Sequence, residues 1–149
     1  MKNYLQNSLR ALFVCACVFF SLPILAEQVE IDGIAYNLVS KVQEATVVAR
    51  ADGKYTGSVE IPASVVHEGV TYAVTTIGKN AFDGCKDMTS IAMPNSIITI
   101  ENNAFYGCRS LTSVTVPNSV TSIAYEAFRY CDKMTSIYIG SGVRSIGSN

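Results

Sequence analysis

The chain has 149 residues, and its 11 basic side chains nearly balance its 12 acidic ones, for a formal net charge of −1. The length suits one domain, and because no basic run is present, the sequence excludes the electrostatic surface of a nucleic-acid-binding protein or of a protein attracted to an anionic membrane. With one histidine and no tryptophan, the chain also offers few side chains from which an active site could be built.

Residues 1–26 have the layout of a secretory signal peptide. Two basic residues, Lys2 and Arg10, precede the uncharged run ALFVCACVFFSLPILA, which ends in the small residue Ala26. This order predicts cleavage after Ala26, so that the mature chain begins at Glu27 and keeps no stable membrane span.

Two alternatives for this segment stay open. A membrane anchor needs about 20 apolar residues, and the run from Ala11 to Ala26 is shorter. A lipoprotein would be attached through Cys17, because Ala16 and Cys17 resemble the end of a lipobox, although Cys15 departs from that pattern. We expect the cleaved signal peptide, which implies export.

Residues 27–54 are predicted to form a small β-strand cap. The segments EIDGIAYNL (30–38) and ATVVAR (45–50) alternate apolar and polar residues, as strands with one buried face do. The Asp-Gly pair in the first segment is typical of a β-hairpin turn. A stack of repeats needs such a cap, because its first repeat otherwise exposes the core.

The remaining residues, 55–149, are built from a repeat of 23 residues. Three copies follow one another: AFDGCKDMTSIAMPNSIITI (81–100), AFYGCRSLTSVTVPNSVTSI (104–123) and AFRYCDKMTSIYIGSGVRSI (127–146). A partial first copy, SVEIPASV (58–65), is interrupted by a hairpin-like insertion at 66–74, and the last copy is incomplete. Several columns that share one period predict a solenoid, in which each repeat forms one turn of a stacked coil.

Each repeat is predicted to contain a short strand and a short helical turn. In the central copy Leu111, Val114 and Val116 lie on the buried face of the strand, and Pro117 ends it because proline has no N–H for the ladder. The AFxxC segment spaces its apolar residues as one helical turn would. Because Phe105 stands between the equivalent phenylalanines of the neighbouring copies, we expect it to be the most buried of the three.

These columns resemble the leucine-rich repeat pattern LxxLxLxxNxL, which is carried here by Leu111, Val114, Val116 and Val120. More specifically, LTSVTVPNSVTSI followed by AFxxC is similar to the BspA-type (Treponema-type) leucine-rich repeat of bacterial surface proteins, over residues 81–146. The resemblance implies a β-rich solenoid and an exported, non-enzymatic protein that is secreted or lies on the bacterial cell surface. It further implies a role in adhesion, with extracellular or cell-surface proteins as partners.

In leucine-rich repeats, the strand residues that face away from the core line the concave sheet, where partners usually bind. Small hydroxyl-bearing residues dominate these positions here, which equally suits a solvated surface, and Tyr138 alone has the character of an interface anchor. The predicted binding face consists of Thr89, Ser90, Ala92, Thr112, Ser113, Thr115, Thr135, Ser136 and Tyr138.

No catalytic, cofactor-binding or metal-binding residues are predicted. His67 has no nucleophile at a fixed spacing, and the carboxylates fall on different turns of the repeat. The cysteines Cys85, Cys108 and Cys131 form no CxxC pair, and neighbouring coils about 4.8 Å apart fit disulfide geometry poorly. We expect these cysteines to be free thiols in the core, and we expect the protein not to be an enzyme.

Two other functions stay open. A carbohydrate-binding accessory module at the cell surface would need more exposed aromatic residues than Tyr138 and the tyrosines of the cap provide. Alternatively, the chain is a truncated fragment of a larger surface repeat protein, since it stops before the next AF turn.

Overall fold

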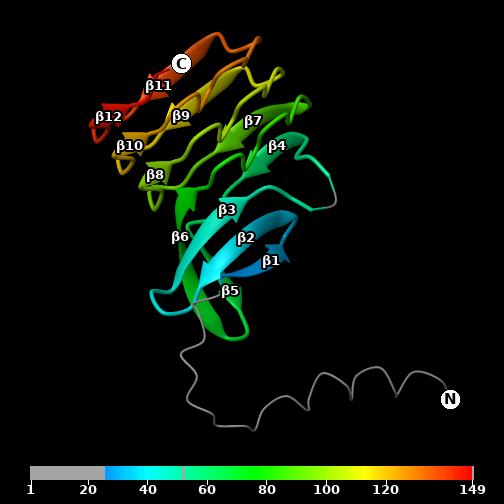
Figure 1. Ribbon diagram of the computed structural model, residues 1–149, viewed down its shortest axis with the longest axis vertical. Helices are drawn as coiled ribbons and strands as arrows, with labels where there is room; N and C mark the ends of the chain where they lie inside the picture. Colours follow the sequence, from blue (N-terminus) through cyan, green and yellow to red (C-terminus); the bar gives the residue numbers. More distant parts are fainter. Residues whose placement is uncertain (1–25, 52, 149) are drawn as a thin grey trace, which may run out of the picture.

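The computed structural model describes residues 26–51 and 53–148, so the predicted signal peptide lies outside the described residues, apart from Ala26. Within those ranges the chain forms twelve strands and no helix, and hence none that is long and apolar enough to cross a membrane. Figure 1 shows the strands of successive coils stacked along the long axis of the molecule.

Three antiparallel strands begin the described chain. β1 (Glu27–Ile31) pairs with β2 (Ile34–Val39), and β2 pairs with β3 (Glu44–Val48). Asp32 and Gly33, between β1 and β2, have positive φ angles of 50° and 77°, as the tight turn of a two-residue hairpin requires. The predicted cap contains these three strands.

A second hairpin connects these strands to the coils. β5 (Ser64–His67) pairs antiparallel with β6 (Val70–Ile77), so the inserted residues 66–74 form the turn of this hairpin and parts of its strands. β6 also pairs in parallel with β3, which joins the antiparallel strands to the stack. From β6 a ladder of short parallel strands continues along one side of the stack: β8 (Thr99–Ile100), β10 (Ser122–Ile123) and β12 (Ser145–Ile146).

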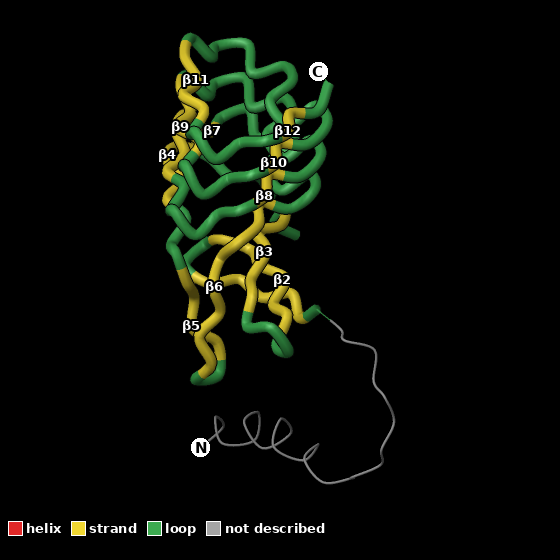
Figure 2. Tube along the Cα trace, turned by 90° about the vertical axis from the view of Figure 1, so that its left-hand side faces the viewer, coloured by secondary structure: helices red, strands yellow, loops and turns green. Residues whose placement is uncertain are grey.

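A second row of parallel strands lies along another side of the stack, at the left in Figure 2. It consists of β4 (Gly57–Glu60), β7 (Met88–Ala92), β9 (Ser113–Val116) and β11 (Ser136–Ile139). β4 pairs with β7 and β9 pairs with β11, while between β7 and β9 the Thr112 N–H donates to the Thr89 carbonyl over 3.4 Å. The pairing of β9 with β11 places each residue beside its equivalent in the next copy, for example Ser113 beside Ser136.

The AFxxC segments form hydrogen-bonded turns rather than the predicted short helical turns. In the central copy the Cys108 N–H donates to the Phe105 carbonyl over 3.2 Å. However, Asn103 before the turn and Gly107 inside it have positive φ angles of 56° and 67°, which a right-handed helix does not admit. The spacing of the apolar residues fits a helix and a turn equally well, and these left-handed residues decide between them.

The core consists of stacked columns of equivalent side chains, of which the phenylalanine column is the clearest. Phe105 lies between Phe82 and Phe128, with ring centroids 5.1 and 5.0 Å apart and nearly parallel planes. Phe128 is partly buried, but Phe82 is as fully buried as Phe105, so the prediction that Phe105 is the most buried of the three is wrong for Phe82. The reason is Tyr55, whose ring covers Phe82 at 4.7 Å.

Tyr55 also fastens the antiparallel strands to this column. Its hydroxyl donates to the Val48 carbonyl over 2.8 Å and accepts a hydrogen bond from the Ala35 N–H over 3.0 Å. One side chain therefore continues the phenylalanine column and binds the backbone of β2 and β3.

The apolar columns are exposed to solvent in the last coil. Ile137 is 40% exposed and Ile146 is 59% exposed, whereas the equivalent residues of the preceding copy, Val114 and Ile123, are each 3% exposed. Tyr138 follows Ile137 in β11, so apolar surface surrounds this predicted anchor.

Candidate functional site

The predicted binding face lies on the strands β7, β9 and β11 and on the residues just before β9 and β11. Parallel pairing places Thr115 beside Tyr138, so equivalent outward positions follow one another from coil to coil. Ser90 is half-buried and donates a hydrogen bond to the Ser58 hydroxyl over 2.9 Å. The other predicted residues are exposed: Thr89, Ala92, Thr112, Ser113, Thr115, Thr135, Ser136 and Tyr138.

This face offers hydroxyl groups and small apolar side chains on a fixed backbone. The residues that alternate with the outward ones in β9, Val114 and Val116, are buried and hold the strand to the core. Tyr138 contributes the largest side chain of the face and is 60% exposed. The face can supply hydrogen bonds and apolar contact area, but of its predicted residues only Tyr138 carries a titratable group, so it is not suited to acid–base chemistry.

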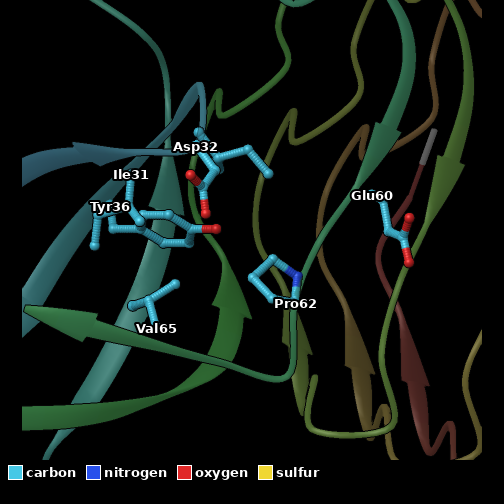
Figure 3. A pocket seen from close by; sticks show the side chains of 7 residues that line it. Ile31, Asp32, Tyr36, Glu60, Pro62 and Val65 are labelled. Atoms are coloured by element: carbon cyan, nitrogen blue, oxygen red, sulfur yellow. The ribbon is translucent and has the colours of Figure 1, made fainter.

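A pocket of about 220 Å³ lies between the β1–β2 hairpin and the first coil (Figure 3). Asp32 and Tyr36 line it from the hairpin, where the Asp32 carboxylate lies beside the Tyr36 hydroxyl, and Pro62 lines it from the segment after β4. Glu60 also borders this pocket. Because Glu60 pairs with Ala92 of the outward row, the pocket adjoins the predicted binding face.

Tyr36 is held in its neutral form within this pocket. Burial raises the pKa of Tyr36 above its ordinary value, and the neighbouring Tyr55 and Asp32 act in the same direction. The hydroxyl therefore stays protonated at neutral pH, where it can take part in hydrogen bonds but cannot serve as a base. A second hollow of about 340 Å³ is also lined by Asp32 and Glu60. Polar surface therefore extends around the contact between the β1–β2 hairpin and the first coil.

The cysteines form a column next to the phenylalanines. The Cys108 thiol donates to the Phe82 carbonyl over 3.2 Å, and the Cys131 thiol donates to the Phe105 carbonyl over 3.3 Å. All three cysteines among the described residues are free, as predicted. Burial raises the pKa of Cys131 to about 11 and also raises the pKa of Cys85 and Cys108, so the reactive thiolate is scarce at neutral pH.

The single histidine lies in the β5–β6 hairpin, away from these columns. His67 is half-buried, and its Nε2 atom lies 3.6 Å from a carboxylate oxygen of Glu27. Within residues 26–51 and 53–148, no three histidine, cysteine, aspartate or glutamate side chains gather closely enough to hold a metal ion.

Tyrosines also gather on the turns that precede β9 and β11, outside the predicted face. The rings of Tyr106 and Tyr130 meet edge to face, with centroids 5.1 Å apart. The Arg129 guanidinium lies 4.8 Å from the Tyr130 ring centroid and donates to its hydroxyl over 3.1 Å. Arg129 also pairs with Glu126, which is buried. Aromatic and charged groups therefore cover this side of the last turns.

The sequence contains one signal for this cluster, a break in a repeat column. Tyr130 stands where the two preceding copies carry Gly84 and Gly107. Columns in which the copies agree indicate the core. A large aromatic residue in a column of glycines indicates instead a feature that is specific to one copy of the repeat.

Glu126 is held in its charged form in this cluster. Hydrogen bonds from Tyr125 and from Arg129 lower the pKa of the Glu126 carboxyl, against the opposing effect of burial. The same pairing raises the pKa of Arg129. The turn thus carries a fixed pair of opposite charges at neutral pH.

The sequence profile of one protein family matches residues 68–149. The family is described as BspA type leucine rich repeat region, and the match comprises six copies. No curated protein matches the chain.

Several solved structures are similar to the chain. A leucine-rich repeat protein from Bacteroides ovatus is 31% identical with a TM-score of 0.74, and the match covers 80% of this chain and 31% of that protein. The chain therefore spans about a third of the length of that relative. A leucine-rich repeat protein from Bacteroides capillosus is 22% identical with a TM-score of 0.52, over 75% of this chain and 97% of that one. The pneumococcal vaccine antigen PcpA is 18% identical with a TM-score of 0.56, over 81% of this chain and 40% of that one.

Proposed function

The chain belongs to the BspA-type leucine-rich repeat family, and we propose that it is an exported, non-enzymatic protein that binds other proteins through the outward row of its sheet. The partners are extracellular or cell-surface proteins, and the binding serves adhesion. Export is supported by the signal-like residues 1–26. The likeness in fold to a pneumococcal vaccine antigen agrees with this location.

The observation that carries the proposal is the row of exposed side chains on successive strands, of which β7 and β9 have their other face in the core. All the predicted residues except Ser90 are exposed, while Val114 and Val116 beneath them are buried. Neighbouring strands of such a sheet lie about 4.8 Å apart, so successive coils place equivalent side chains side by side. A surface that is fixed in advance loses little conformational freedom on binding, which favours affinity.

Tyr138 is the proposed anchor of this surface. Protein interfaces take most of their affinity from a few aromatic or arginine residues that become buried. Tyr138 offers a large ring and a hydroxyl, whereas Thr115 beside it in the ladder offers little contact area. Ile137 and Ile139 of the same strand are also exposed, so we place the centre of the contact at this end of the row.

The pocket between the β1–β2 hairpin and the first coil extends the proposed binding surface at the end opposite Tyr138. Asp32 and Glu60 contribute carboxylates to it, and carboxylates bind arginine or lysine side chains through charge-assisted hydrogen bonds. We therefore place a basic side chain of the partner at this pocket.

Binding is tested on an array of extracellular-matrix proteins and bacterial surface proteins, with a glycan array run beside it. We expect a protein partner whose binding is weakened by Tyr138→Ala. Tyr125→Ala is the matched control, because Tyr125 is also exposed but lies on the turn after β10, outside the predicted binding face. A protein partner that binds the Tyr138→Ala variant as well as the unchanged protein contradicts the proposal, and so does binding to glycans alone.

Export is tested separately by the intact mass of the protein after secretion. We expect the secreted chain to begin at Glu27. A secreted species that retains residues 1–26 contradicts cleavage, and a lipid-modified species that begins at Cys17 supports the lipoprotein alternative.

A further inference from the structure

A hollow on the turn side of the coils combines aromatic rings with cationic groups. Its volume is about 210 Å³, which is below the roughly 300–1,000 Å³ of pockets for drug-sized ligands and suits a small ligand. It lies on the turns before β7, β9 and β11, and it is lined by two tyrosines, two glycines and three charged residues.

Tyr130, in one wall of the hollow, has a backbone conformation that tyrosine rarely adopts. Its φ angle is 57°, and at the equivalent positions Gly84 and Gly107 have φ angles of 67°, which glycine adopts without steric cost. A bulky residue in this region is an outlier, and backbone strain of this kind gathers at functional sites. The Arg129 guanidinium lies over the Tyr130 ring and donates a hydrogen bond to the Tyr130 hydroxyl, and both interactions hold the strained residue in place.

Two glycines, Gly84 and Gly107, line the same hollow as this ring. A Cβ atom on Gly107 would meet Gly84 as its nearest neighbour at 3.8 Å, and one on Gly84 would meet the end of Lys54 at 3.9 Å. Neither Cβ atom would clash, and the two glycines place no side chain of their own in the hollow. Tyr106 completes the aromatic wall through its edge-to-face contact with Tyr130.

Cationic groups outnumber carboxylates around the hollow. Lys86 and Arg109 line it together with Asp83, and the Lys54 ammonium group donates to the Asp83 carbonyl. Asp132 lies 3.6 Å from Arg109, but both side chains are more than half exposed, so water and salt weaken this pair. An anionic ligand in the hollow would therefore be attracted to it.

We propose that this hollow binds a saccharide that carries a carboxylate. The apolar face of a pyranose ring lies on the exposed ring of Tyr130, and the sugar hydroxyls exchange hydrogen bonds with the polar groups around it. The carboxylate pairs with Lys86 and Arg109. A bare anion would leave the tyrosines unused, and a neutral sugar would leave the cations unused. The site lies apart from the sheet face and does not depend on the protein-binding proposal.

Calorimetric titration with trigalacturonate tests this site, with maltotriose as a neutral sugar of the same length. We expect saturable binding of trigalacturonate that weakens as salt is added, because the interaction is partly electrostatic. Maltotriose should bind at least about tenfold more weakly, since it lacks the charge-assisted hydrogen bonds.

Tyr130→Gly is the decisive variant, because it restores the residue of the two preceding copies and relieves the backbone. It should fold at least as stably as the unchanged protein and bind trigalacturonate about tenfold more weakly. Tyr138→Ala, an exposed tyrosine on the sheet face and outside the hollow, should leave binding unchanged. Lys86→Ser removes a cation from an exposed position, and its binding should weaken without any loss of folding.

Three results overturn the proposal. The first is the absence of saturable trigalacturonate binding, and the second is unchanged binding by a folded Tyr130→Gly protein or, if that variant does not fold, by Lys86→Ser. The third is equal affinity for maltotriose and trigalacturonate, which overturns the assignment of an acidic ligand.

Discussion

Truncation of Phe105 to alanine should destabilise the protein by about 4–5 kcal/mol, the upper part of the range for a buried phenylalanine. The side chain is fully buried, and the rings of Phe82 and Phe128 cover its two faces at 5.1 and 5.0 Å. Each aromatic pair contributes about 0.5–1.5 kcal/mol beyond the burial of area, and the substitution removes two such pairs.

The cavity left by this substitution cannot close easily, because hydrogen bonds fix the spacing of the coils. The Phe82 N–H donates to the Ala104 carbonyl and the Phe105 N–H donates to the Ala127 carbonyl, both over 2.8 Å. Collapse of the neighbouring rings into the cavity would lengthen these bonds. The destabilisation should therefore include most of the cavity term as well as the lost burial.

Denaturant titration followed by circular dichroism measures the change in the free energy of unfolding. Phe128→Ala is the matched control, because Phe128 is partly buried and only Phe105 stacks on it within the column, so its loss should be smaller. A destabilisation below about 1 kcal/mol at Phe105 would refute the stacked column, and so would a larger loss at Phe128.

Three further predictions concern other columns of the repeat. The thiols of the three AFxxC turns should resist a thiol reagent in the native protein and all react after unfolding, because burial raises their pKa; a count of one thiol after unfolding would reveal a disulfide. The lowered pKa of Glu126 means that its charged form stabilises the fold above its ordinary pKa of 4.5 and that this contribution is lost as the pH falls through the folded-state value, so Glu126→Gln should flatten the acid limb of a stability–pH curve, and an unchanged limb would contradict this. Gly142→Ser should destabilise the protein by about 1–3 kcal/mol, because a Cβ atom there would lie 1.9 Å from the Asn118 carbonyl oxygen; a neutral result in denaturant titration would show that the last coil can move aside.

The repeat period predicts the core columns because stacked coils bring equivalent residues together. Leu111, Val114 and Val116 are buried as their alternation predicts, and Thr115 and Tyr138 lie side by side as the interval of 23 residues requires. These features depend only on local alternation and on a fixed spacing, and both can be read directly from one sequence.

The features that the sequence did not reveal depend on contacts without a period. Tyr55 extends the phenylalanine column, yet it lies three residues before Ser58, whereas Phe105 lies eight residues before Ser113. The shortened connection takes it out of the repeat register. The parallel pairing of β3 with β6 likewise joins segments that are distant in the chain.

The turn-side cluster escaped prediction because its residues break the repeat pattern. Tyr130 replaces a glycine and Glu126 replaces an asparagine, and both have positive φ angles, 57° and 52°. Asparagine and glycine tolerate positive φ angles. In the sequence alone, the two exchanges therefore look like ordinary variation between repeat copies. Backbone angles show that they carry a conformational cost.

Protein binding by the outward row is tested most directly by the affinity of an array-selected protein partner for a matched pair of surface variants. Tyr138→Ala should weaken binding by about 1–2 kcal/mol, or roughly 5–30-fold, while the unfolding midpoint stays unchanged because the side chain is 60% exposed. Charge substitutions at Arg109 or Asp132, on the turns, should leave the affinity for that protein nearly unchanged. Loss of binding through the charge substitutions, with full affinity in Tyr138→Ala, would contradict the assignment of the sheet as the binding face.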